Sequence, residues 1–167
     1  MFKKIINFLK SIFMKEKKYK EYYKHNEEGN VIEYRVCNGD MEFVHQYDKN
    51  GNEIYYKNPN GDEEWFEYDE NDNEIYSRSS NGFECIREYD DEDNMIHYKN
   101  SDGEESWRKY DENNNMIYYK HSCACECWME YDDKGNKIHY KDSDGNEEWG
   151  KYYEGGVITI TNQVLKN

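Results

Sequence analysis

The stretch DNMIHYKNSDGEESWRKYD, residues 93–111, contains two short aromatic and β-branched runs on either side of Asp102-Gly103. Each run has the length and composition of a β-strand. An Asp-Gly pair between two such runs favours a two-residue hairpin turn. The stretch therefore predicts a β-hairpin.

The same pattern recurs along most of the chain. An asparagine stands two residues before, and a lysine or arginine three residues after, six of seven regularly spaced isoleucines. The isoleucines are 20–22 residues apart and are Ile32, Ile54, Ile75, Ile96, Ile117, Ile138 and Ile158. A Gly-x-Glu-x-Trp-like run and then a Tyr-Asp pair complete most units. Such self-similarity indicates a repeat protein. We expect an all-β fold of about six tandem 21-residue β-hairpin repeats, forming an elongated antiparallel meander or a spiral.

The composition agrees with a repeat array and not with a large spherical core. Leucine and valine, the usual core residues, are scarce, whereas aromatic residues make up 17% of the chain. A mean hydropathy of −1.36 and a net charge of −15 would alone suggest disorder. The aromatic content argues against disorder, because disordered segments are poor in aromatics.

The predicted turns also predict a register for the strands. Two-residue turns place Tyr140 opposite Trp149 and Lys141 opposite Glu148, with Ile138 and Tyr140 on the face that carries Trp149. The equivalent aromatic pairs are Tyr56 with Trp65, Tyr98 with Trp107 and Tyr119 with Trp128. The loop after each Tyr-Asp pair is predicted to use Asx-type hydrogen bonds and a left-handed residue.

These motifs resemble the YD repeats of RHS-type proteins. The resemblance is carried by Tyr-Asp, Gly-Asn-x-Ile and Gly-x-Glu-x-Trp at residues 47–149, and it covers residues 25–158. The unit is also similar in style to the MORN-type repeats of small bacterial antitoxin-like proteins. RHS proteins use such repeats as a shell around a toxin. Six repeats are too few to enclose a domain, so the resemblance implies the fold and not the shell function.

The first 24 residues differ from the rest in charge. They hold eight lysines and two acids, a net charge of +6, which leaves −21 for the remainder of a chain of net charge −15. Apolar residues recur at helical spacing between the lysines, so residues 2–20 are predicted to form an amphipathic helix. The chain is thus divided into a basic helix, 1–24, and an acidic repeat array, 25–167. The helix could cap the array, contact an anionic membrane surface, or dock into a partner or a second copy.

Five cysteines, three of them crowded together, do not form the even, spaced pattern of a secreted disulfide framework. A reducing, cytoplasmic location is expected, peripheral at the membrane if the helix binds there. His121, Cys123, Cys125 and Cys127 are possible zinc ligands, but alternate positions on a strand are unlike a C-x-x-C site. Neither a metal nor another cofactor is therefore expected. The recurring carboxylates beside bases fit structural ion pairs, so no catalytic site is expected.

The charge leads to the functional expectation. An array of net charge −21 repels nucleic acid and attracts the basic channels that bind it. We expect an acidic protein-binding module with no direct nucleic-acid contact. Its most specific form is an inhibitor of a basic nucleic-acid-binding enzyme: an immunity protein, an antitoxin, or a phage anti-CRISPR or anti-defence protein. The alternatives are a membrane-associated scaffold anchored by the helix, a relative of cell-surface repeat proteins displayed outside the cell, and a charge that serves only solubility. The candidate binding residues are Trp65, Trp107, Trp128, Trp149, Glu63 and Glu105.

Overall fold

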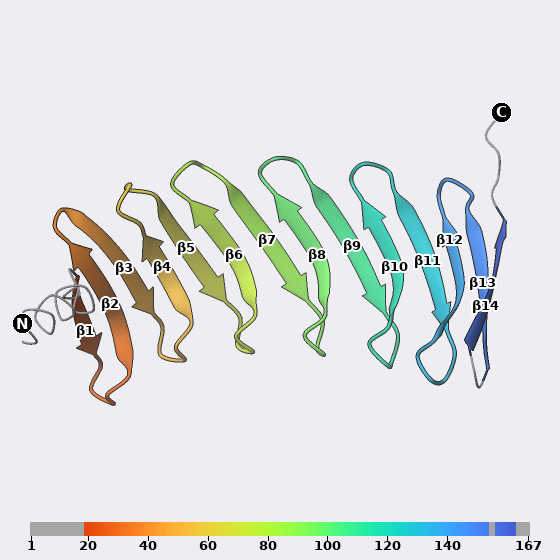
Figure 1. The fold of residues 1–167 in the computed structure, drawn as a ribbon, viewed down its shortest axis with the longest axis horizontal. Coiled ribbons are helices and arrows are strands. Elements are labelled where there is room, and N and C mark those ends of the chain that lie inside the picture. Colours follow the sequence, from red (N-terminus) through yellow and green to blue (C-terminus); the bar gives the residue numbers. More distant parts are fainter. Residues whose placement is uncertain (1–18, 154–155, 163–167) are drawn as a thin grey trace, which may run out of the picture. The chain divides into compact units, whose positions relative to one another are not determined.

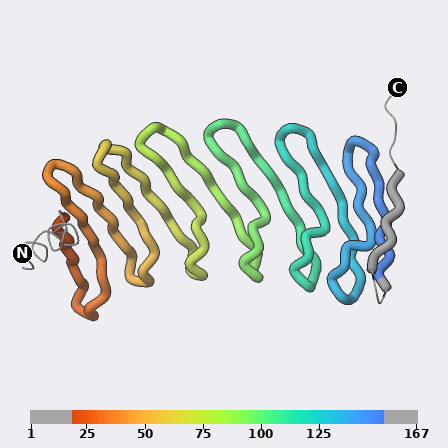
Figure 2. The backbone as a smooth tube through the Cα atoms, viewed as in Figure 1, coloured from red at the N-terminus to blue at the C-terminus, as the bar shows by residue number. Residues whose placement is uncertain are grey.

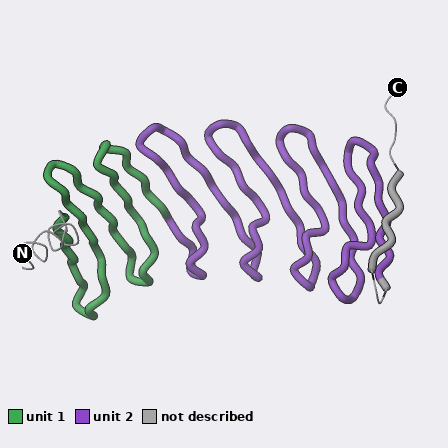
Figure 3. Tube along the Cα trace, viewed as in Figure 1, with its two compact units in different colours: residues 1–66 green, residues 67–167 purple. Residues whose placement is uncertain are grey.

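The computed structural model describes residues 19–153 and 156–162, and its side chains from 19 to 152. All regular structure among these residues is β-strand, and no helix in this part is long and apolar enough to cross a membrane. The chain divides into two compact units, residues 1–66 (unit 1) and 67–167 (unit 2) (Figure 3). We describe each unit by itself.

Unit 1 is an antiparallel meander in which each strand pairs with its neighbours in sequence (Figure 1). Its strands are β1 (Lys20–His25), β2 (Val31–Asn38), β3 (Met41–Tyr47), β4 (Glu53–Lys57) and β5 (Glu63–Tyr68), the last of which runs across the unit boundary. Strand β1 corrects the sequence analysis, because residues 20–24 were assigned to the helix. The adjacent Tyr22 and Tyr23 have high β-strand propensity, and residues 20–24 pair with Glu33–Cys37. The rest of the predicted helix, residues 1–18, lies outside the described residues.

Unit 2 continues the same plan (Figures 1 and 2). Its strands are β6 (Glu74–Ser79), β7 (Glu84–Tyr89), β8 (Met95–Asn100), β9 (Glu105–Tyr110), β10 (Met116–His121), β11 (Glu126–Tyr131), β12 (Lys137–Asp142), β13 (Glu147–Tyr153) and β14 (Gly156–Asn162). Each of β7 to β13 pairs with the strand before it and the strand after it, and β6 and β14 do not pair with each other. The predicted all-β array of hairpins is confirmed as an unclosed antiparallel meander.

The turns explain why the strands end where they do. In the loop after β11, the Asp132 carboxylate accepts hydrogen bonds from the backbone N–H groups of Lys134 and Asn136, both at 2.9 Å. Gly135, with φ 78°, supplies the left-handed position that lets the chain reverse. Sister loops use Asp or Asn at this position, namely Asp72, Asp93 and Asn114. The predicted Asx bonding and left-handed residue are therefore confirmed.

The hairpin turns on the other edge do not have the predicted two residues. Between β8 and β9, the Asn100 N–H donates to the Glu104 carbonyl at 3.0 Å, which leaves three loop residues with Gly103 left-handed. The Asn100 side chain holds this loop by accepting from the N–H groups of Asp102 and Glu104. Three-residue loops of this kind are the next commonest after two-residue turns. Asp-Gly therefore serves as the last two residues of a longer loop.

The extra loop residue shifts the predicted register by one. Trp149 lies opposite His139, while Tyr140 lies opposite Glu148 and Lys141 opposite Glu147. The other predicted aromatic pairs shift in the same way, to Tyr55 with Trp65, His97 with Trp107 and Tyr118 with Trp128. Because side chains alternate along a strand, Ile138 and Tyr140 lie on the face opposite Trp149. The predicted face assignment of these two residues was wrong.

Each sheet is a single layer with two unequal faces. We name the face of each unit that carries its tryptophans the Trp face, and the other the Tyr face. In unit 2 the buried residues all lie on the Tyr face, and they are Cys85, Asn100, Ser106 and Met129. No described side chain is less than 2% exposed. Contacts between neighbouring strands therefore replace the usual layered core.

The Tyr-Asp pair ties together the two strands of its own hairpin. Its tyrosine hydroxyl donates to a backbone carbonyl at the start of the preceding strand, from Tyr89 to Glu74, from Tyr110 to Met95 and from Tyr131 to Met116, at 3.1–3.3 Å. Its aspartate opens the next loop. The motif therefore ends a strand, closes its own hairpin and starts the connection to the next one.

A row of serines joins the hairpins at the opposite edge. Ser101, Ser122 and Ser143 each donate their N–H to a glutamate carbonyl of the preceding hairpin, at 2.7–2.8 Å. Their hydroxyl oxygens accept from the same glutamates' N–H groups at 3.1 Å. Pro59 occupies the equivalent position in unit 1 and has no N–H to donate.

Tyr131→Phe should lower the free energy of unfolding by about 0.5–1.5 kcal/mol, because it removes one hydrogen bond and leaves the Met116 carbonyl unpaired. Urea denaturation followed by tryptophan fluorescence measures the change. Tyr152→Phe is the control, because the Tyr152 side chain is 42% exposed. Equal stability of the two variants would contradict a structural role for the Tyr-Asp hydroxyl.

Candidate functional site

The Trp face is a ladder of aromatic cross-strand pairs. His97 stacks on Trp107 with ring centroids 5.5 Å apart, and His139 stacks on Trp149 at 5.3 Å. The tilted pairs are Tyr55–Trp65 at 5.7 Å in unit 1 and Tyr118–Trp128 at 6.0 Å in unit 2. All four predicted tryptophans thus occupy equivalent positions in their units. Aromatic cross-strand pairs of this kind stabilise a sheet by about 0.2–1 kcal/mol each.

Glutamates on this face sit beside bases. Lys57 Nζ lies 3.1 Å from Glu63, and Lys99 Nζ lies 3.6 Å from Glu105. Glu105 also contacts His97 Nε2 at 2.9 Å. The two predicted binding glutamates are therefore members of ion pairs that join strands, and the charge of the Trp face is largely balanced.

The tryptophans differ in their access to solvent. Trp128 is 42% and Trp149 38% exposed, and Ile86, which takes the Trp position in β7, is 47% exposed. Trp65 and Trp107 are half-buried. Trp128 and Trp149 are therefore more exposed to solvent than Trp65 and Trp107.

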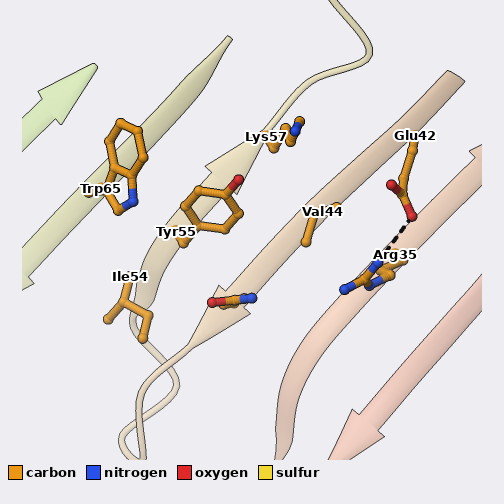
Figure 4. A pocket seen from close by; sticks show the side chains of 8 residues that line it. Arg35, Glu42, Val44, Ile54, Tyr55, Lys57 and Trp65 are labelled. Carbon is orange, nitrogen blue, oxygen red and sulfur yellow. Dashed lines mark hydrogen bonds and ion pairs between the residues drawn. The ribbon is translucent and has the colours of Figure 1, made fainter. Parts of the chain in front are cut away.

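Unit 1 has an open groove on its Trp face, of about 480 Å³ (Figure 4). Val44, only 5% exposed, lies at its floor between Arg35 and Tyr55, with Trp65 beyond. Val44 stands where four other repeats have tryptophan, so a smaller side chain leaves the space. The groove was not predicted from the sequence.

Eleven of the 25 acidic residues of unit 2 lie at one edge. The loops after the Tyr-Asp tyrosines, residues 69–73, 90–94, 111–115 and 132–136, form what we call the acidic edge; they hold eleven acids and one base, Lys134. Side-chain amides connect successive loops: Asn73 donates to Asp93 at 2.7 Å, and Asn94 to Asn114 at 3.0 Å. From the sequence, acid is expected over the whole array, whereas these four loops carry much more net negative charge than the rest of unit 2.

Several loop-opening carboxylates are stabilised in their charged form. The Asn115 side-chain amide and backbone N–H lower the pKa of Asp111, and those of Asn136 lower the pKa of Asp132. Burial is the largest effect on Asp69, but hydrogen bonds from Asn73 outweigh it and lower its pKa as well. Asp69, Asp111 and Asp132 therefore keep their charge into more acidic solution than an ordinary aspartate.

The crowded cysteines lie at a loop and the strand that follows it. Cys123 is in the loop between β10 and β11, Cys125 follows the left-handed Ala124, and Cys127 lies within β11. His121 Nδ1 accepts a hydrogen bond from the Cys123 N–H, so its lone pair is occupied. Across the side chains that the structure describes, no three His, Cys, Asp or Glu residues are grouped to hold a metal ion. The four possible zinc ligands are therefore not brought together.

The chain's fold has relatives among solved structures. Crystal structures of TcdB2-TccC3-TEV and of TcdB2-TccC3 match 77% of this chain and 8% of theirs, with TM-scores of 0.58 and 0.57 at 15% and 14% identity. TcdB2-TccC3 without its hypervariable C-terminal region gives 0.58 at 14% identity. At such identities the likeness is to the fold alone, and it agrees with a YD/RHS-like repeat. No protein-family model and no curated protein sequence matches the chain significantly.

The histidines of the Trp face should make stability depend on pH. Burial lowers the pKa of His97, but the hydrogen bonds that its ring donates to Glu105 and Glu88 outweigh this effect. The hydrogen bond that His139 donates to Glu147 raises the pKa of His139. A pKa raised in the folded state adds stability below the ordinary value of 6.5, and this stability is lost as pH rises through the folded values.

We expect the free energy of unfolding of Cys123→Ser protein to fall between about pH 6 and pH 8, and to fall less after His97→Gln and His139→Gln are added. The Cys123→Ser background is needed because the Cys123 thiol, whose pKa is lowered, would make the free energy of unfolding rise with pH and so mask the effect of the histidines. Denaturation curves at several pH values measure both slopes. The same slope in both proteins would contradict the assignment to these histidines.

Cys123 should react as a thiolate near neutral pH. Its pKa is lowered to about 7, chiefly by hydrogen bonding from Cys125 and then by His121. The rate of iodoacetamide alkylation at Cys123 should rise with a midpoint near pH 7, and Cys125→Ala should move that midpoint upward. Cys127 is the internal comparison, because burial raises its pKa. An unchanged midpoint in the variant would show that Cys125 does not activate Cys123.

Proposed function

We propose that this chain is a binding module for a basic protein, with the acidic edge of unit 2 guiding the encounter and the Trp face supplying the anchors. The observation that carries the proposal is the gathering of eleven acids and one base into four adjacent loops. A field of one sign at one edge raises the local concentration of an oppositely charged partner. It also disfavours nucleic acid, whose phosphates carry the same sign.

The two surfaces contribute to different steps of binding. Charges at a solvent-exposed edge are screened by salt over about 8 Å at physiological ionic strength, so they chiefly affect association. Aromatic side chains that become buried in an interface chiefly affect dissociation. Trp128 and Trp149 have exposed area left to bury, whereas Glu63 and Glu105 are held in ion pairs within the sheet.

The specific form that we propose is inhibition of a nucleic-acid-handling enzyme, as an immunity protein, an antitoxin or an anti-defence protein would act. A cleft that binds nucleic acid is basic and would fit an acidic edge. The membrane-scaffold alternative depends on residues outside the described part of the chain, and no observation on the sheet favours it.

Charge reversal at the acidic edge tests the steering role. The exposed residues Glu70, Asp91, Glu112 and Asp133 are changed together to lysine, which leaves the loop-opening aspartates in place. The control protein reverses four exposed acids of unit 1, namely Glu27, Glu28, Asp40 and Glu64. Both variants have the same net charge. A difference between them in binding therefore reports where the charges lie, and not how many there are.

Wild type, edge variant and control serve as parallel baits in extracts of the source cells, read by mass spectrometry. We expect a basic protein held by wild type and control and lost from the edge variant. Its association rate with wild type should fall steeply with salt, and with the edge variant should be about tenfold or more slower. Trp128→Ala should mainly speed dissociation. The proposed electrostatic steering would be overturned if the association rate of the retained protein did not depend on salt. It would also be overturned if that protein were lost equally from the edge variant and the control.

If the retained protein cuts or copies nucleic acid, adding this chain should reduce its activity in proportion to the complex formed. Unchanged activity in the saturated complex would contradict the proposed inhibition, although the chain would still be a binding module.

A further inference from the structure

One hairpin loop differs chemically from its neighbours. In the loop between β10 and β11, Cys123 and Cys125 stand on either side of Ala124, where the equivalent loops of unit 2 have Asp or Asn, then Gly, then a non-sulfur residue. Both cysteines are exposed and free. Their sulfur atoms are 2.9 Å apart, less than 1 Å longer than a disulfide bond of about 2.05 Å.

The loop holds the two sulfurs on a fixed frame. The His121 N–H donates to the Cys125 carbonyl at 2.9 Å, and the Ala124 N–H to the His121 carbonyl at 3.0 Å. Ala124 has φ 70°, the left-handed conformation that reverses the chain between the two cysteines. The Ser122 N–H joins the loop to the Glu105 carbonyl of the preceding hairpin at 2.7 Å. Little chain entropy remains to be lost when the sulfurs join.

We propose that Cys123 and Cys125 form a dithiol–disulfide site that exchanges with small disulfides of the glutathione class. The Cys123 thiolate attacks one sulfur of the small disulfide, forms a mixed disulfide and releases the other half as a thiolate. The Cys125 thiol gives its proton to water, and its thiolate attacks the Cys123 sulfur. The Cys123–Cys125 bond forms, and the second half leaves as a thiolate. Two protein thiols are oxidised and one disulfide is reduced to two thiols.

The surroundings distinguish the attacking sulfur from the resolving one. Cys123, with its pKa near 7, is partly ionised at neutral pH, where an attacking thiol is most effective. Cys125 has a raised pKa, chiefly through its hydrogen bond with Cys123 and with contributions from Asp142 and Asp144. It therefore keeps its proton until Cys123 has reacted. The mixed disulfide also removes the charge on Cys123 that raised the pKa of Cys125.

The remaining cysteines serve as internal comparisons. Cys85 is only 3% exposed and contacts the Ser77 hydroxyl. Cys127 is half-buried on the Tyr face of β11, and burial raises its pKa. Cys37 is half-buried beside Glu42, whose carboxylate lies 3.8 Å from its sulfur. Exchange should therefore be selective for the loop.

The test treats the reduced full-length protein with oxidised glutathione, blocks free thiols with N-ethylmaleimide at timed intervals, and maps the peptides. Cleavage after Lys120 and Glu126 isolates residues 121–126, which contain Cys123 and Cys125 without Cys127. We expect this peptide to lose two hydrogen atoms, with only a transient glutathione adduct, at least tenfold faster than Cys37, Cys85 or Cys127 reacts.

Two single variants assign the roles. Cys125→Ser should accumulate a lasting glutathione adduct on Cys123, because the resolving thiol is gone, whereas Cys123→Ser should react slowly at Cys125. Circular dichroism establishes whether each variant keeps its β-structure. If a variant does not, the peptide map of the wild-type protein alone decides the outcome. A lasting adduct in wild type, a disulfide to Cys127, or equal reaction at all five cysteines would overturn the proposal. This test is independent of the proposed partner.

Discussion

The fold depends on one local interaction, the bond from a loop-opening Asp or Asn side chain to two backbone N–H groups further along the loop. Asp132 makes it on one edge and Asn100 on the other. This interaction fixes a three-residue loop, the loop fixes the register, and the register decides which side chains share a face. In a single-layer sheet no second layer could correct a wrong register, so the specification must come from the turns.

The sequence was sufficient for the class of fold and the position of the hairpins, because a 21-residue period leaves few other solutions. It was insufficient for the register, since Asp-Gly fits both a two-residue and a three-residue turn. The one extra residue of a three-residue turn places Tyr140 on the face opposite Trp149. Lys20–Lys24 were misassigned because lysine and tyrosine are compatible with helix and strand, and their pairing with β2 is a tertiary contact.

The candidate surfaces were predictable to different degrees. The tryptophans recur at fixed positions, so their common face follows from periodicity. The acidic edge follows from periodicity as well, but only once alternate loops are assigned to the same edge, as the contact from Asn73 to Asp93 requires. The groove over Val44 depends on the absence of a large side chain, which is harder to read than the presence of a motif. The approach of Cys123 to Cys125 depends on the conformation of Ala124, which composition does not reveal.

The serine bonds and tyrosine hydroxyl bonds of unit 2 recur from one hairpin to the next, with the same geometry each time. Interactions that reach no further than the adjacent hairpin make each hairpin an exchangeable part. Excision of residues 90–110 would join Tyr89 to Asp111, recreating the Tyr-Asp pair and offering the Glu84 carbonyl to Ser122 in place of Ser101. Duplication of the same segment would be equally compatible with the bonding pattern. The length of such a chain can therefore change during evolution by whole hairpins, through recombination between its own repeats, without redesign of the sheet.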